Sequence, residues 1–226
     1  MRESESVTGM VLLSAPSGEY DRRLVLLTRE RGKITAFAHG ARRPGSPLMA
    51  ASRTFAFGVF SVYEGRTAYT LHGAQISEYF EELSLDVEAA CFGSYFLEVA
   101  AFLSQENMDG SELLKLVYVS LKALGKPSIP NRLVQRVFEL RALVIDGQYT
   151  QTPPEAVSEA CAYAWEYVIT APVQRLYRFT LKEGPLKEFE RAVEASRRRF
   201  IRHSFRSLEI LESLKALSSP GGDTNS

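Results

Sequence analysis

Cysteine is scarce in this chain, with only Cys91 and Cys161 among 226 residues. Two cysteines seventy positions apart cannot build a disulfide-rich scaffold, and no C-x-x-C pair is present, so we expect a reducing, cytoplasmic environment. The opening residues MRESESVTG lack the apolar stretch of a secretory signal peptide. No uncharged apolar run approaches the roughly 18 residues that a membrane-spanning helix needs, so we expect no such helix.

The sequence also lacks the motifs of common enzymes and metal sites. His39, His72 and His203 lie in different segments, so no pair has the i, i+4 spacing of helical metal ligands. The stretch 40–46, GARRPGS, has the glycine spacing of a phosphate-binding loop but no lysine before its serine. We therefore expect no catalytic activity, no cofactor and no bound metal.

Charge is unevenly distributed, although 27 basic and 27 acidic side chains cancel over the whole chain. Residues 20–53 hold eight Lys/Arg against two Asp/Glu, and residues 175–206 hold ten against four. Between them, residues 81–160 hold six against twelve. Because a polyanion responds to local rather than to total charge, the two basic segments are candidate contacts for nucleic acid or for acidic protein segments.

The hydrophobic period changes near residue 80, which predicts an α+β protein of two domains. In residues 1–80, short β-branched and aromatic runs separated by turn residues predict a small closed barrel. Its five predicted strands are 7–14, 23–28, 33–40, 54–63 and 67–76. Gly58, inside an aromatic-rich strand, is expected at a bend or bulge of that barrel.

Residues 81–214 have helical spacing and predict an all-helical domain, followed by a Ser/Gly/Pro-rich disordered tail at 215–226. The predicted helices are 84–104, 111–124, 131–146, 154–170, 185–203 and 206–214. Asn131 is expected to cap the third helix, and the fourth is expected to have proline in its first turn.

The predicted third strand and the loop after it carry the best candidates for a binding surface. Strand alternation places its small apolar residues inside the barrel and Lys33, Phe37 and His39 outside. An aromatic ring beside cations can stack a nucleic-acid base. The alternative is that Phe37 packs under a loop or against the helical domain. Arg42 and Arg43, on a Gly/Pro loop, have little role in a core and are expected to contact phosphates without reading sequence.

A second set of candidates lies in the basic stretch RRRFIRHSFRS at 197–207. Arg198 and Arg202 fall nearly opposite the apolar stripe of the predicted helix, so they form either a solvated face or an auxiliary surface for nucleic acid or a partner. The residues alone therefore leave two functions open. One is DNA binding, and the other is an interaction scaffold whose basic faces bind acidic protein segments.

Several short motifs follow one another along nearly the whole chain. They are Gly9-Met10-Val11-Leu12, Glu19-x-Asp21-Arg22, Thr28-Arg-Glu-Arg-Gly32-Lys33, Ala38-His39-Gly40-Ala41-Arg42-Arg43, Phe138-Glu-Leu-Arg-Ala-Leu143 and Phe205-Arg206-Ser207-Leu208. In this order and spacing they resemble the RecO family of bacterial DNA repair and recombination mediators. The resemblance implies an N-terminal OB-fold followed by a helical domain.

The resemblance also implies an ATP-independent, nucleoid-associated cytoplasmic protein that binds single- and double-stranded DNA and anneals complementary strands. The partners it implies are RecR, with which RecA is loaded on strands coated by the single-stranded-DNA-binding protein (SSB), and the acidic C-terminal tail of SSB. The family's basic OB-fold surface would fall on Arg22, Arg31, Lys33, Arg42 and Arg43, and the tail-binding site near Arg136 and Arg141.

Two features depart from the family pattern. Many relatives hold a structural zinc with two cysteine pairs after the F-E-L-R motif, whereas residues 147–172 contain only Cys161, so we expect no zinc. Relatives often have lysine where this chain has His39. A histidine there weakens one cationic contact near neutral pH and is expected to make DNA binding modestly stronger at acidic pH.

Overall fold

The computed structural model describes residues 4–218 and begins with a closed five-stranded barrel in the order β1-β2-β3-β5-β4. The strands are β1 (Ser4–Ser17), β2 (Asp21–Thr28), β3 (Gly32–Ala38), β4 (Phe57–Tyr63) and β5 (Tyr69–Glu78). Strand β1 pairs with both β2 and β4, and β3 and β5 are parallel, which closes the sheet. The α+β class and the N-terminal OB-type barrel predicted from the sequence are therefore confirmed.

Strand alternation decides which side chains fill the barrel. Ile34, Ala36 and Ala38 of β3 are buried together with Leu24 and Leu26 of β2, as the sequence pattern predicts. The two alanines are small enough to let the opposite walls of a five-stranded barrel approach each other. The interior is thus a packed apolar core.

Gly58 lies at a bulge, as expected. The register between β4 and β5 shifts between Phe57 and Gly58. A Cβ atom at position 58 would lie 2.1 Å from the carbonyl oxygen of Gln75, so the strands can approach this closely only at a glycine. The loop before β4, predicted without structure, contains a single helical turn, α1 (Leu48–Ala51).

After β5, all regular secondary structure of the described chain is helical. The helices are η1 (Glu81–Leu85), α2 (Val87–Leu103), α3 (Ser111–Leu124), α4 (Asn131–Ile145), α5 (Glu159–Thr170), η2 (Val173–Arg175), α6 (Glu183–Phe200) and α7 (Arg206–Ser218). Helix α7 extends four residues into the predicted disordered tail, and the remainder of that tail, 219–226, lies outside the described residues. No helix of the described part is long and apolar enough to cross a membrane.

The start of α4 at Asn131 is as predicted, but its cap is not, and both the start of α5 and the proline expected in its first turn were wrong. The N-cap of α4 is Pro130, and Asn131 is its first helical residue, whose amide instead donates to a carboxylate oxygen of Glu88 at 3.0 Å. Helix α5 starts at Glu159 rather than at 154, because Ser158 is extended and its Oγ accepts the backbone N–H of Cys161. The Ser158 backbone N–H also donates to the Glu188 carboxylate at 2.9 Å, which holds the preceding segment away from a helical path.

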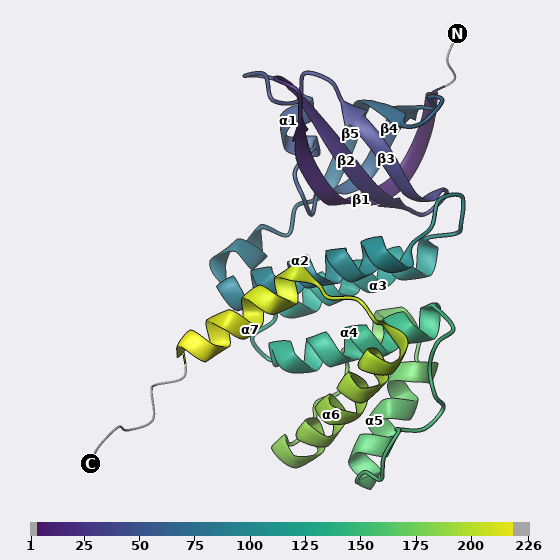
Figure 1. The fold of residues 1–226 in the computed structure, drawn as a ribbon, viewed down its shortest axis with the longest axis vertical. Helices are drawn as coiled ribbons and strands as arrows, with labels where there is room; N and C mark the ends of the chain where they lie inside the picture. The colour runs from purple at the N-terminus through teal and green to yellow at the C-terminus, as the bar shows by residue number, and fades with distance from the viewer. Residues whose placement is uncertain (1–3, 219–226) are drawn as a thin grey trace, which may run out of the picture.

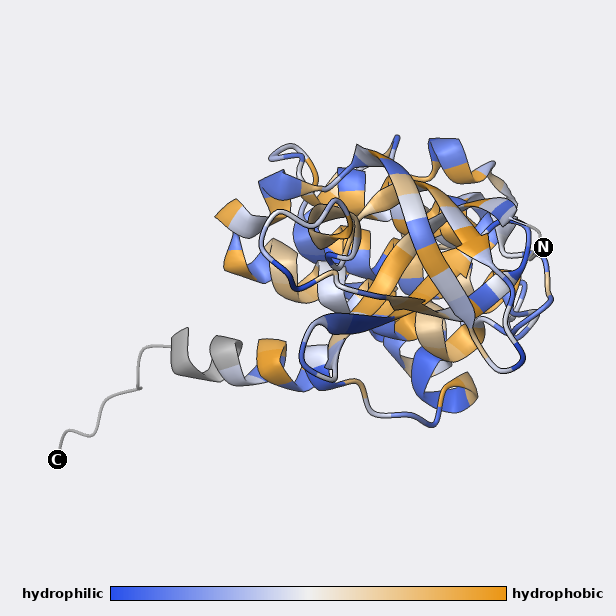
Figure 2. Ribbon diagram, turned by 90° about the horizontal axis from the view of Figure 1, so that it is seen from above, coloured by the Kyte–Doolittle hydropathy of each residue, from blue (hydrophilic) through white to orange (hydrophobic). Residues whose placement is uncertain are grey.

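The barrel stands on the helical domain with the β2–β3 turn pointing down to it (Figure 1). Three barrel residues pack into the main hydrophobic core of the helical domain: Met10, Leu12 and Leu27. Backbone hydrogen bonds tie the turn to segment 105–110: Lys33 N to Gln105 O at 3.0 Å, Asn107 N to Arg31 O at 2.9 Å and Gly110 N to Arg29 O at 3.2 Å. Seen from above, hydrophobic colour concentrates on the barrel strands and hydrophilic colour on the surrounding loops (Figure 2).

Candidate nucleic-acid interface

The end of the barrel away from the helices gathers several of the predicted binding residues. Because the β2–β3 turn faces the helical domain, the start of β2 and the end of β3 lie at the opposite end (Figure 1). The β1–β2 turn at 18–20 and the loop at 39–47 meet there. We call this region the distal end of the barrel.

Asp21 organises the distal end. Its carboxylate accepts the backbone N–H of Gly40 at 2.7 Å and contacts Nδ1 of His39 at 2.6 Å. The hydrogen bond from Gly40, followed by the one from His39, holds the pKa of Asp21 below its usual value, so this group is a carboxylate at neutral pH. The left-handed φ of Gly40, +68°, turns the chain back across the β1–β2 turn.

Arg42 and Arg43 present their charges on this frame. Arg42 donates from Nη1 to the carbonyl oxygens of Gly18 and Glu19, at 3.2 and 3.1 Å, which orients the guanidinium without neutralising it. The guanidinium carbon of Arg43 lies 4.9 Å from the ring centroid of Tyr20, whose side chain is exposed. Neither arginine forms a salt bridge among the described residues, and both are exposed, although the charge of Arg43 is near enough to help lower the pKa of Asp21.

Phe37 lies on the outer face of β3 beside the distal end. It is half-buried, and its ring lies nearly parallel to that of His39, with centroids 6.4 Å apart and an interplanar angle of 15°. Directly opposite it on β2 is Arg23, which is exposed. Arg23 is absent from the predicted site, although alternation from the inward-facing Leu24 would have identified it as an outer-face cation.

Arg22 has a different environment from its neighbour. It pairs with the fully buried Ala38 across the sheet, which places its side chain on the inner side at the distal end of the barrel. Its Nη1 donates to Ser14 Oγ at 2.9 Å, and its Nε is buried with no hydrogen-bond partner among the described residues. Arg22 therefore closes the barrel end from within.

Arg31 and Lys33 lie at the opposite end of the barrel from Arg42 and Arg43. A strand the length of β3 spans about 20 Å, which separates the two groups. Arg31 makes a two-pronged salt bridge to Glu5, at 2.9 and 3.1 Å, and Nζ of Lys33 donates to the carbonyl oxygen of Ala101 at 2.7 Å. The five cations expected to share one surface therefore occupy three environments, and only Arg42 and Arg43 face solvent together.

The candidates at the C-terminal basic stretch flank the end of α6. Arg198 is exposed, but its Nε contacts the Glu194 carboxylate at 2.6 Å. Arg202 lies beyond the end of α6 in the link 201–205, and it is exposed without a salt bridge among the described residues. Since the helix stops at Phe200, a continuous basic helical face through Arg202 does not form.

Arg136 and Arg141 are engaged inside the helical domain. Arg136 contacts the carboxylates of Glu139 and Glu194 at 2.7 and 2.6 Å, and although burial opposes its charge, these carboxylates raise its pKa. Nη1 of Arg141 donates to the carbonyl oxygens of Val168 and Ile169 at the end of α5, and burial lowers its pKa. Both guanidinium groups hold helices together.

No group of three or more His, Cys, Asp or Glu side chains in residues 4–218 is arranged to hold a metal ion. Cys91 and Cys161 are both free thiols, and burial raises the pKa of Cys161 to about 11. Trp165 stabilises the segment before α5, because its indole N–H donates to the carbonyl oxygen of Thr150 at 3.1 Å.

Comparison with known proteins identifies the family. The family model "Recombination protein O N terminal" matches residues 1–80, and "Recombination protein O C terminal" matches residues 84–153. The chain is 24% identical to the DNA repair protein RecO of Acetivibrio thermocellus over 92% of this chain and 96% of that protein. It is 31% identical to the DNA repair protein RecO of Alkaliphilus metalliredigens over 79% of this chain and 68% of that protein. The chain therefore belongs to the RecO family of DNA repair and recombination proteins.

Proposed function

We propose that this protein is an ATP-independent recombination mediator that binds DNA through the distal end of its barrel. In this function it anneals complementary strands and, with RecR, helps to load RecA on single strands coated by SSB. Family membership supports the role in repair, and the exposed Arg42 and Arg43 beside the exposed ring of Tyr20 support the DNA contact. Arg136 and Arg141 carry no part of the proposal, because both are engaged inside the helical domain.

The chemistry of the distal end suits a sugar–phosphate backbone. Arg42 is held by two carbonyl oxygens through one of its nitrogens, so its other N–H groups remain available to a phosphate. Tyr20 and Phe37 offer ring surface on which an unpaired base can stack. No rigid array of hydrogen-bonding side chains faces outward here, so we expect binding that depends weakly on base sequence.

Oligonucleotide titration at several salt concentrations tests the proposal. The double variant Arg42→Ala/Arg43→Ala should weaken binding to every sequence and reduce the steepness of the log–log salt dependence by about 1.4 for single strands. The matched control is Arg175→Ala/Arg178→Ala, which removes two exposed arginines from the helical domain. Unchanged affinity and salt dependence in the Arg42/Arg43 variant would refute the assigned surface.

The same titration separates the proposal from an interaction scaffold. A scaffold would bind a poly-glutamate peptide and leave the oligonucleotide free, whereas the proposed function requires the reverse order of affinity.

Strand annealing measured with and without SSB, in the presence of RecR, then tests the mediator activity. Annealing that is blocked by SSB under all conditions would contradict that part of the proposal while leaving DNA binding intact.

A further inference from the structure

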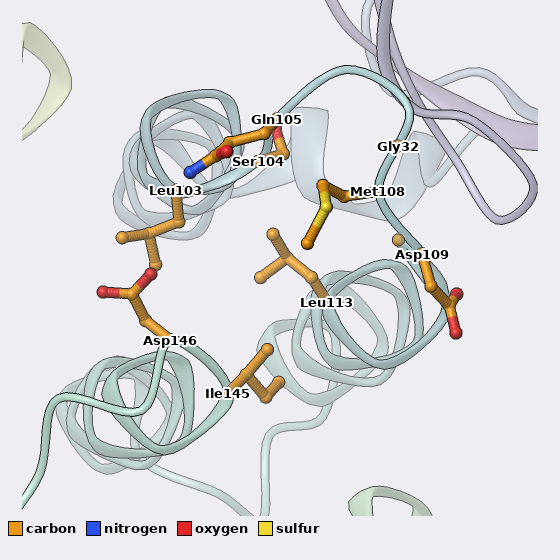
Figure 3. Close-up of a pocket in the computed structure, with 10 residues that line it drawn as sticks. Gly32, Leu103, Ser104, Gln105, Met108, Asp109, Leu113, Ile145 and Asp146 are labelled. Atoms are coloured by element: carbon orange, nitrogen blue, oxygen red, sulfur yellow. The ribbon is translucent and has the colours of Figure 1, made fainter.

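A cavity of about 310 Å³ lies where the barrel meets the helical domain, remote from the distal end. Its lining comes from the turn residue Gly32, from the C-terminal ends of α2 and α4 and from the start of α3. Figure 3 shows the side chains of Leu103, Met108, Leu113 and Ile145 around the central space. Aliphatic side chains and polar groups therefore share the walls of the cavity.

One polar group in this lining has no partner. Ser104, which caps α2, is only 7% exposed, and its Oγ forms no hydrogen bond among the described residues. A buried hydroxyl without a partner costs about 1–3 kcal/mol, but this Oγ is closed off from solvent, so the cost belongs to the packing at the end of α2. The accessible polar lining comes instead from Asp146 and Gln105, so an occupant needs hydrogen-bonding groups as well as apolar surface.

The electrostatics of the cavity favour a cation. Two helix C-termini converge on it, and each carries a partial negative charge from its unpaired carbonyl groups. The exposed Asp146 carboxylate lies on the rim beside Leu103 (Figure 3); one of its oxygens accepts the side-chain amide of Gln148 at 2.9 Å, and the other is open to a ligand. The ammonium of Lys33 already donates to the carbonyl of Ala101 at the barrel side of α2, which shows how this helix end attracts a cation.

The positive end of α3 does not offset this field. Asp109 accepts the backbone N–H of Ser111 at 2.8 Å and so occupies the helix N-terminus. In Figure 3 the Asp109 carboxylate points away from the central space. A ligand in the cavity would therefore contact the carboxylate of Asp146. Asp109, whose carboxylate points elsewhere, provides a control position for mutation.

We propose that this junction cavity binds an arginine or lysine side chain from a basic segment of a partner protein. The aliphatic stem lies against Leu103, Met108 and Leu113, and the cationic head reaches the Asp146 carboxylate. Long basic side chains have this combination of an apolar stem and a charged head. Charge complementarity excludes an acidic peptide from the same place, and the inference does not depend on how DNA is bound.

Chemical-shift mapping of the full chain with an acetylated, amidated heptapeptide GSLRLSG tests the inference. Shifts should concentrate at residues 103–113 and 145–146, and the GSLQLSG peptide should bind about tenfold or more weakly, as expected for a lost charge-assisted hydrogen bond. Asp146→Asn should reduce the affinity for GSLRLSG by a similar factor, while Asp109→Asn should leave it unchanged.

Met108→Lys supplies a second, independent check. Met108 is 60% exposed, so its replacement is tolerated by the fold, and the new ammonium should compete for Asp146 and suppress peptide binding. Equal binding of the arginine and glutamine peptides, or insensitivity to Asp146→Asn and Met108→Lys, would overturn the inference. Spermidine binding without peptide binding would also overturn it, because the site would then take a free polyamine.

Discussion

Glu139 offers the sharpest test of how the helical domain is held together. Its side chain is 1% exposed, and its carboxylate accepts hydrogen bonds from Tyr95 Oη at 2.8 Å, Gln135 Nε2 at 3.1 Å and Arg136 Nη1 at 2.7 Å. These donors come from α2 and α4, and Arg136 continues the network to Glu194 on α6. Replacing Glu139 with glutamine keeps the shape of the side chain and removes its charge.

The expected loss follows from the charge that remains. In Glu139→Gln, the buried guanidinium groups of Arg136 and Arg197 must share Glu194, which the exposed Arg198 also contacts, since Arg197 Nε also lies 3.8 Å from Glu139. Breaking a buried ion pair from one side costs about 3–5 kcal/mol. We expect about 3 kcal/mol, the low end, because Glu194 still compensates one of the two charges. For a chain of this size the melting temperature should fall by about 6–12 °C.

Urea unfolding followed by circular dichroism measures this change, and a double-mutant cycle assigns it. Arg136→Met in the Glu139→Gln background restores charge balance. The double variant should therefore lose less free energy of unfolding than the two single variants lose together, by at least about 1 kcal/mol. Tyr95→Phe removes one neutral donor and should cost about 1.5 kcal/mol. A Glu139→Gln loss below about 1 kcal/mol, or additive single losses, would refute the network argument.

Two further predictions concern the domain junction and acid stability. Gly32→Ala should lower the free energy of unfolding by at least about 2 kcal/mol, because φ is +63° and the added Cβ would lie 2.2 Å from the Gln105 carbonyl oxygen. Gly18→Ala, at φ +65° in open space, should cost only about 1 kcal/mol in the same denaturant titration, and equal losses would contradict the close approach. Although burial opposes ionisation, hydrogen bonds from Arg197 lower the pKa of Glu194 from 4.5 to about 2. The contribution of Glu194 to the free energy of unfolding is therefore present above pH 4.5 and is lost as the pH falls towards 2. That contribution is at most about 3 kcal/mol, or about half after solvent screening, and an unchanged acid-unfolding curve in Glu194→Gln would exclude it.

Much of the fold follows from sequence period alone. Five strands and the main helices were predicted near their observed places because each has one apolar face, and helix 111–124 matches α3 at both ends. The failures are at helix starts, where local preference competes with tertiary contacts. Ser158 caps α5 because its N–H reaches Glu188 on α6, a contact between residues thirty positions apart that no local pattern contains.

The binding surface was harder to predict than the fold. A count of basic residues along 20–53 treats all of them alike, whereas strand direction sends Lys33 to the helical domain and Arg43 to the distal end. Alternation could have separated Arg22 from Arg23, since only Arg23 shares the outer face with Phe37. Which end of the barrel would meet the helices depends on the docking of the β2–β3 turn, which is a tertiary event.

The backbone hydrogen bonds between that turn and segment 105–110 also have a mechanical consequence. Gly32 and Gly110 each pack tightly against the opposing main chain. We therefore expect the barrel and the helical domain to move as one rigid body rather than as two domains on a flexible linker. A molecule bound at the distal end of the barrel would therefore stay at a fixed distance and angle from a molecule bound to the helices.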